Sequence, residues 1–202
     1  NTEEVIESVS IIGSAEDQKN LAGSGQIISN ADLLKAMDTD IQKILTAVPG
    51  VYMRTEEGYG LRPNISIRGT AIERSAKVAI MEDGVLVAPS PYTSSAAYYF
   101  PTTGRIHSVE VLKGPAAVSQ GPQTIGGAIN LISTPIPNAP SGKFVQELGE
   151  NGMMRTHAYY GGTSGNFGGL VEVHEHESDG FDSIANVGGD TGFDKSDLMV
   201  KA

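Results

Sequence analysis

The stretch SVEVLKGPAAVSQGPQTIGGAINLIS, residues 108–133, decides the fold of this chain. It begins inside an apolar strand in which alternate side chains share a face. Gly114-Pro115 then breaks the strand, because proline cannot continue the hydrogen-bonded ladder and favours a turn. Gly126-Gly127 lets the backbone pass close to a neighbour, and a second apolar strand follows. The stretch therefore predicts two strands separated by turns.

Two helices are expected upstream of this stretch. Ser29 or Asn30 can cap the first helix, and Asp40 can cap the second. Pro49-Gly50 ends the second helix, since proline breaks the ladder and glycine accepts the tight turn. The apolar positions at helical spacing are Leu33, Leu34 and Met37 in the first helix, and Ile41, Ile44, Leu45 and Val48 in the second.

Short apolar runs predict the strands of the same unit. Asp83-Gly84 is typical of a hairpin turn between two of them. Helices mixed with strands and compact turns indicate an α+β unit that ends near Thr134. The expected strands are residues 51–55, 64–68, 77–81, 85–87, 106–112 and 128–132.

Long extended segments follow a linker that contains Pro135, Pro137 and Pro140. Their alternation of apolar and polar side chains is typical of a barrel wall, although Leu170 falls on the polar side. Because a few strands cannot close and an open edge in lipid is not viable, we expect a fragment of something longer. The segments are residues 143–149, 155–162, 168–177 and 198–201, and in the third Val171 and Val173 face away from Glu172, His174 and His176.

Composition and charge exclude several classes of protein. The net charge is −10, which argues against nucleic acid as a partner because phosphate binding needs a basic surface. Without cysteine, neither a disulfide nor a thiolate metal site is possible. No run of about 18 apolar residues predicts a transmembrane helix, and no signal segment opens the sequence. A membrane location stays open, because transmembrane strands give a weaker signal.

Enzyme and metal readings find little support. Residues 121–127 are glycine-rich like a P-loop but lack the Lys-Ser/Thr pair that binds phosphate and Mg²⁺. The Gly-x-Ser-x-Gly motif of serine hydrolases does not occur either. His174 and His176 share a strand face with Glu172 and could hold a transition metal. No third histidine is near in sequence, however, and closed sites need three or four ligands. We therefore expect no catalytic residue, no metal and no cofactor, and interpret the histidines as lumen-facing.

Four blocks of sequence resemble one known family. Residues 108–133 resemble the signature of TonB-dependent receptor plugs, which is an IEVLRGP strand and turn, a short helix and then GGxINxIT. DIQKILTAVPGV (40–51), ISIRG (65–69) and VAIMEDGV (78–85) resemble three more blocks of the same domain, in the right order. The resemblance covers about residues 4–134. Within the family, SQGPQTIGG and RSAKVAIMEDG look most like the ferric citrate receptor branch.

This resemblance implies an α+β plug domain followed by the start of an antiparallel transmembrane β-barrel in the bacterial outer membrane. The expected boundaries are residues 1–25 for a periplasmic arm, 26–138 for the plug and 139–202 for the first strands of a truncated barrel. Gly126-Gly127 would then allow the plug to pack against the barrel wall. The alternative is a soluble plug-like binding or interaction module that acts alone in the periplasm.

The resemblance also implies a receptor that gates energy-coupled uptake without covalent chemistry. The expected partners are TonB, a ferric siderophore or ferric citrate, and outer-membrane lipid. Haem, cobalamin and other metal chelates stay open as ligands. The candidate TonB box is Ile6, Glu7, Ser8, Val9, Ser10 and Ile11, which is suited to adding a strand to a partner's sheet edge. A first strand of the plug itself would fit the same residues.

Three loops, residues 54–63, 69–76 and 88–100, should form the ligand-binding apex. Their arginines could contact an anionic ferric chelate, and their tyrosines offer flat amphipathic surface. The alternative is solvated charges and packing aromatics. The candidate ligand-binding residues are Arg54, Arg62, Arg74, Tyr92, Tyr98 and Tyr99.

Arg68 and Lys113 occupy two basic positions that, in the family, lie between plug and barrel and pair with barrel carboxylates. A buried cation needs such a partner. The family usually has arginine at the second position, and lysine there loses the bidentate fork. The alternative is that both are solvated charges at strand ends.

Overall fold

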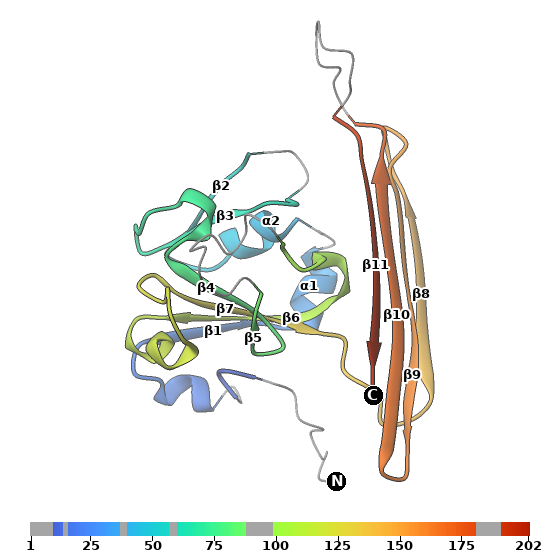
Figure 1. Cartoon of the computed structure of the whole chain (residues 1–202), viewed down its shortest axis with the longest axis horizontal. Coiled ribbons are helices and arrows are strands. Elements are labelled where there is room, and N and C mark those ends of the chain that lie inside the picture. Colours follow the sequence, from blue (N-terminus) through green and yellow to red (C-terminus); the bar gives the residue numbers. More distant parts are fainter. Residues whose placement is uncertain (1–9, 14–15, 37–39, 57–59, 88–98, 181–190) are drawn as a thin grey trace, which may run out of the picture. The chain divides into compact units, whose positions relative to one another are not determined.

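The computed structural model describes residues 10–13, 16–36, 40–56, 60–87, 99–180 and 191–202. The chain forms two compact units, Asn1–Thr134 and Pro135–Ala202. Each unit contains a β-sheet of its own (Figure 1). The division between them falls at the first proline of the expected linker.

The first unit contains a five-stranded mixed sheet in the order β1-β6-β7-β4-β5. Within the described residues, β4 and β7 run parallel and the other neighbours run antiparallel. A separate antiparallel pair joins β2 and β3. The bounds are β1 (Ser24–Ile28), β2 (Val51–Arg54), β3 (Asn64–Ile67), β4 (Val78–Glu82), β5 (Val85–Leu86), β6 (Ile106–Lys113) and β7 (Gly127–Ser133).

Two short α-helices begin beside capping side chains. Asp40 Oδ1 accepts a hydrogen bond from Gln42 N at 2.8 Å at the start of α2. Before α1, Ser29 Oγ accepts from Asp32 N, and the Asp32 carboxylate accepts from Ser29 Oγ and N, which lowers the pKa of Asp32. Among the described residues, no helix has the length and apolarity to span a membrane. The helical elements are η1 (Asp17–Asn20), α1 (Asn30–Ala36), α2 (Ile41–Thr46), η2 (Glu73–Ser75), η3 (Thr103–Arg105) and η4 (Pro115–Gln120).

Separate apolar clusters cover the two faces of the five-stranded sheet. One cluster packs the sheet against α2 and the β2–β3 pair, and the other packs it against the N-terminal segment and η4. Each fully buried Ile or Leu contributes roughly 1.5–3 kcal/mol to stability. The first cluster includes Ile41, Leu45, Ile65, Ile67, Val109, Ile129 and Leu131, and the second includes Ile12, Met81, Leu112, Ala117 and Ala128.

Gly126 and Gly127 are needed because backbone of the same unit passes close to them. A Cβ on Gly126 would lie 2.9 Å from Lys77 O, and a Cβ on Gly127 would overlap Leu112 O. The close approach predicted from the sequence is therefore present. The neighbours belong to the first unit itself, so no barrel wall is needed to explain the two glycines.

Most elements of the first unit lie where the sequence predicts them. The six expected strands begin and end within one residue of their predicted bounds. Sequence analysis missed η1 and β1, which overlap the expected periplasmic arm. The strand β1 pairs with β6, so that Ser24 lies opposite Lys113 and Ile28 opposite Val109. This pairing joins residues that are far apart in sequence, which a local pattern cannot indicate.

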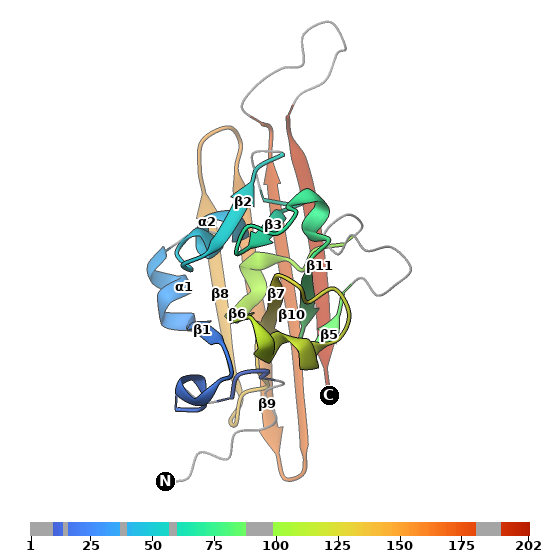
Figure 2. The same cartoon turned by 90° about the vertical axis from the view of Figure 1, so that its left-hand side faces the viewer.

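The second unit is a four-stranded antiparallel sheet in the order β11-β10-β9-β8. Figure 1 and Figure 2 show its strands side by side. Asn151 and Gly152 turn the chain between β8 and β9 with φ of 56° and 63°, and two positive φ angles are typical of a tight hairpin. The bounds are β8 (Ser141–Leu148), β9 (Met154–Ser164), β10 (Phe167–Ser178) and β11 (Phe193–Lys201).

Candidate functional site

Hydrogen bonds join the first and second predicted apex loops. The Ser75 hydroxyl donates to Pro63 O at 3.1 Å and accepts from Ile65 N at 3.0 Å. Asn64 Oδ1 accepts from Arg74 N at 2.7 Å. These bonds make the two loops one structure, and the positions of their charged side chains are therefore coupled.

The turn that joins these loops contains a strained backbone. Arg74 and Ser75 have φ of 51° and 55°, and each such non-glycine residue costs on the order of 1–3 kcal/mol. The Ser75 side chain is fully buried, so its two hydrogen bonds offset part of this cost. Strain of this kind clusters at functional sites. Sequence analysis did not find this turn, since a serine in a polar loop is ordinary.

The arginines of the joined loops differ in their partners. Arg54 pairs with Glu73 Oε1 at 3.0 Å and more loosely with Glu56 Oε1 at 3.7 Å, and all three side chains are exposed. Exposed pairs contribute little to stability. Arg62 is exposed as well. The side chain of Arg74 is exposed and has no partner in the part of the chain that the structure describes. Arg74 is therefore available to a ligand.

Tyr99 is tied to an ion pair within the first unit. Arg105 pairs with Glu82, and the Tyr99 hydroxyl donates to Glu82 Oε2 at 3.3 Å. Arg105 Nη2 donates to the same hydroxyl at 3.4 Å. Tyr99 is thus anchored by its hydroxyl, while 45% of the residue is exposed. The other two candidate tyrosines, Tyr92 and Tyr98, lie outside the described residues.

Arg68 and Lys113 come together at the turn that starts with Gly114. Arg68 Nη1 lies 2.8 Å from the position of a Cβ on Gly114, whose φ of +86° already favours glycine. Lys113 Nζ donates to Pro49 O at 2.9 Å. Burial and the nearby Arg68 charge lower the pKa of Lys113. Neither cation has a carboxylate partner among the described residues.

The end of the candidate TonB box lies on the five-stranded sheet. Ser10 Oγ and Ile11 N both donate to the carboxylate of Glu110 on β6. Sequence analysis did not single out Glu110. A carboxylate between Val109 and Val111 in an apolar strand is the signal that could have found it, because such a residue is rarely buried without a partner. Ile6, Glu7, Ser8 and Val9 lie outside the described residues.

One face of the second unit is polar. The predicted alternation of Val171 and Val173 with Glu172, His174 and His176 is present in β10, and Leu170 lies on the polar face. The ring centroids of His174 and His176 are 6.3 Å apart. Among the described residues, no group of three or more His, Cys, Asp or Glu side chains could hold a metal ion. The cross-strand pairs on the polar face are Glu147–Arg155 and His157–Glu172, the latter with Nε2 and Oε1 2.7 Å apart.

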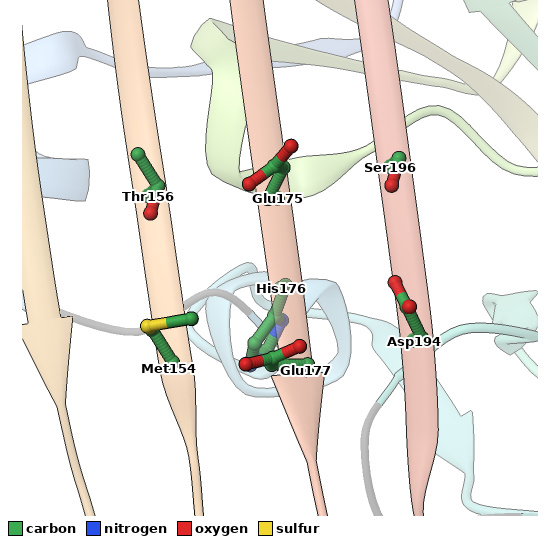
Figure 3. Close-up of a pocket in the computed structure, with 7 residues that line it drawn as sticks. All are labelled: Met154, Thr156, Glu175, His176, Glu177, Asp194 and Ser196. Carbon is green, nitrogen blue, oxygen red and sulfur yellow. The ribbon is translucent and has the colours of Figure 1, made fainter.

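The opposite face, which we call the outer face, changes along its length from apolar to acidic. At its apolar end, Phe144, Tyr160, Val171, Leu198 and Val200 are each at least half exposed. Beyond them lies the pocket shown in Figure 3, which Glu175, Glu177 and Asp194 line from two neighbouring strands. The four-strand rows on this face are Gly142–Tyr160–Val171–Val200, Phe144–Ala158–Val173–Leu198, Gln146–Thr156–Glu175–Ser196 and Leu148–Met154–Glu177–Asp194.

The sequence profile of the TonB-dependent Receptor Plug Domain matches residues 17–128, more than half of the chain. The chain belongs to the TonB-dependent receptor plug family. This membership confirms the resemblance inferred from the four sequence blocks. As a member of this family, the chain is part of a bacterial outer-membrane protein.

A curated relative of this plug protein is a transporter by name. The vitamin B12 transporter BtuB of Photobacterium profundum is 25% identical over 164 residues, which make up 81% of this chain and 26% of the relative. The chain therefore spans about a quarter of the length of this curated relative.

Two solved structures resemble the plug protein in fold. The ferric citrate transporter FecA in its unliganded form has a TM-score of 0.68 at 24% identity, over 82% of this chain and 27% of that one. The ferric yersiniabactin uptake receptor FyuA from Yersinia pestis has a TM-score of 0.69 at 21% identity, over 91% of this chain and 29% of the receptor chain. The expected fold class, an α+β plug followed by antiparallel barrel strands, is confirmed.

Proposed function

We propose that the chain is the plug and first barrel wall of a receptor that gates TonB-driven uptake of a ferric chelate, either a siderophore or ferric citrate. The observation that supports this most is the succession of a plug-family unit and an antiparallel sheet with one apolar face. The ligand binds at the extracellular side, and TonB supplies the energy by pulling on the N-terminal arm. No covalent chemistry is required.

The joined loops supply the cationic part of the ligand site. Arg74 has an exposed guanidinium without a partner among the described residues. Arg54 lies near this residue, because Arg54 pairs with Glu73, which precedes Arg74 in the sequence. A guanidinium forms strong charge-assisted hydrogen bonds with carboxylate or catecholate oxygens. Arg62 is another exposed cation of these loops, and Tyr92, Tyr98 and Tyr99 of the third loop add flat aromatic area. An anionic ferric chelate is the ligand that this chemistry favours.

Cobalamin is a second candidate ligand. The observation in its favour is the 25% identity with a vitamin B12 transporter. The Arg74 side chain distinguishes the two candidate ligands, the ferric chelate and cobalamin. Binding of a ferric chelate with several negative charges depends on a loop cation, whereas binding of cobalamin depends mainly on apolar and neutral polar contacts.

The outer face of β8–β11 supports a place in the lipid. Phe144, Tyr160 and Leu198 are each more than 60% exposed. A soluble protein rarely exposes a contiguous apolar patch of this kind, and the face would be covered by lipid in a barrel wall. This argues against the soluble periplasmic module.

Arg68 and Lys113 suit the contact between plug and barrel. Burial of Lys113, together with repulsion from the nearby Arg68 charge, lowers the pKa of Lys113, as expected for two close cations without a carboxylate among the described residues. Carboxylates on the remaining barrel strands would satisfy both, and the pair would then hold the plug in place. The bond from Lys113 to Pro49 O engages one donor of the ammonium group and leaves the others for such a partner.

The test is ligand binding and growth with the full-length receptor. We expect the receptor to support growth on ferric citrate or a siderophore under iron limitation. Arg74→Ala should weaken binding of that chelate by about tenfold or more, as the loss of one charge-assisted hydrogen bond predicts. Lys35→Ala, which removes an exposed cation from α1, is the matched control. Unchanged chelate binding by Arg74→Ala, or binding of cobalamin alone, would contradict the proposal.

A further inference from the structure

A carboxylate lies in the middle of the sheet face that the N-terminal segment covers. Glu110 on β6 is 1% exposed and stands opposite Asn130 of β7 in the strand register. The surrounding cluster is apolar and includes Leu112 and Ala128. A buried carboxylate is tolerated only where hydrogen bonds satisfy its oxygens. The donors at Glu110 therefore decide how stable this face is.

Within the described residues, three groups donate to Glu110, and two of them come from the N-terminal segment. Ser10 Oγ donates to Oε1, and Ile11 N donates to Oε2 at 2.8 Å. The third donor, Asn130 Nδ2, reaches Oε2 at 3.1 Å from the neighbouring strand. Gly13 N donates to Ser10 Oγ at 2.7 Å, which closes a turn and fixes the serine hydroxyl. The polar contacts between the segment 10–13 and the sheet thus converge on this one carboxylate.

The side chain of Asn130 extends the same network to the other end of the sheet. Its Oδ1 accepts a hydrogen bond from Gly84 N at 2.9 Å, in the turn between β4 and β5. The strand β5 leads directly into the third predicted apex loop. A continuous line of hydrogen bonds therefore runs from Ile11 through Glu110 and Asn130 to Gly84.

We propose that Glu110 is a positioning residue that retains the segment 10–13 on the plug until TonB draws the arm away. This inference rests on the proposed function. Release of the segment leaves Glu110 with Asn130 as its one protein donor among the described residues, and that loss opposes spontaneous release. Ile12, which is 4% exposed, adds apolar contact at the same place. Because Asn130 also holds Gly84, a movement of the β4–β5 turn changes the hold on the arm.

The experiment measures hydrogen–deuterium exchange of the Ile11 amide in the full-length receptor. We expect Ser10→Ala and Glu110→Gln each to speed this exchange, by about tenfold for Glu110→Gln, since a hydrogen bond to a charged acceptor becomes a weaker neutral one. Glu110→Ala removes every acceptor and should have the largest effect.

Matched controls separate local release from unfolding. Glu56→Gln and Ser119→Ala remove an exposed carboxylate and an exposed hydroxyl elsewhere, and should leave Ile11 exchange unchanged. The amides of β6 and β7 must stay protected in each variant. Ser10→Ala keeps the proposal testable if Glu110→Ala fails to fold, because Ser10 lies outside the sheet. Equal Ile11 exchange in wild type, Ser10→Ala and Glu110→Gln, with the sheet intact, would overturn the proposal.

A second measurement keeps this inference distinct from the proposed function. Binding of the TonB carboxy-terminal domain, without ligand, should tighten in Glu110→Gln because the arm is released more often, and Ser10→Ala is left out of this measurement because Ser10 belongs to the candidate TonB box. Faster exchange with no TonB binding in any variant supports the role of Glu110 and overturns the receptor function. Normal TonB binding with unchanged Ile11 exchange supports the receptor function and overturns the role of Glu110.

Discussion

Replacement of Gly127 by alanine should destabilise the plug more than a typical core substitution. The new Cβ would overlap Leu112 O on β6 and would lie 2.9 Å from Ile67 Cδ1 on β3. Backbone cannot yield as a flexible side chain can. The β6–β7 ladder, which pairs Lys113 with Gly127, must therefore open at this end.

The size of the stability loss follows from the hydrogen bonds that break when the ladder opens and from the new contact with Ile67. One or two ladder hydrogen bonds are lost at about 1 kcal/mol each, and overpacking against Ile67 adds roughly 1–3 kcal/mol. We expect a loss of about 3 kcal/mol in the free energy of unfolding. Gly69→Ala is the matched control, because Gly69 has φ +77° and no atom within 4 Å of a new Cβ. It should lose only the backbone cost, about 1–2 kcal/mol.

The assay is urea unfolding of residues 10–134, followed by far-ultraviolet circular dichroism. The midpoint and slope give the free energy of unfolding for wild type and both variants. A loss for Gly127→Ala that is no larger than the loss for Gly69→Ala would refute the steric argument. A changed slope would indicate instead that the substitution altered the compactness of the denatured state.

Three further expectations concern the arm, the isolated plug and the charge pair. Deletion of residues 1–9 should leave ligand binding intact and abolish uptake, because most of the candidate TonB box is lost while Ser10 keeps its place; retained uptake would speak against the box. Residues 10–134 alone should fold and bind a ferric chelate weakly, since barrel loops supply part of the site, and a tight complex by calorimetry would contradict a shared site. The stability of this unit should rise with alkaline pH, between the lowered pKa of Lys113 and the ordinary value of 10.5. In that range the folded state has lost a proton that the unfolded state still binds. Lys113→Met should abolish this rise in urea midpoints, and a persistent rise would assign it to another group.

Local patterns were sufficient to predict most elements of the plug. Asp40 marked the start of α2, and the alternation and turns around Asp83-Gly84 marked β4 and β5. These features are determined by residues that are neighbours in sequence. The strand β1 was missed because its stability comes from pairing with β6, whose residues lie more than 80 positions away.

The candidate site was predictable only in part for the same reason. The charge and aromatic content of the apex loops was visible in the sequence, but the bond between Arg54 and Glu73 and the anchoring of Tyr99 depend on long-range contacts. The turn at Ser75 carried no local signal at all. The roles of the predicted ligand-binding residues stay predictions.

The outer face of the second sheet also limits how far the wall can move. Side chains on one face of a strand repeat about every 6.8 Å, so the change from Val173 to Glu175 takes place within a single repeat. A slip of the wall by one repeat, toward its apolar rows, would carry Glu175 and Ser196 into the edge of the hydrocarbon, at a cost of up to about 1 kcal/mol for the carboxylate, and the cost would grow with depth. A further slip would add Glu177 and Asp194. Under the proposed function, these carboxylates would resist sliding of the wall through the bilayer while the arm is pulled.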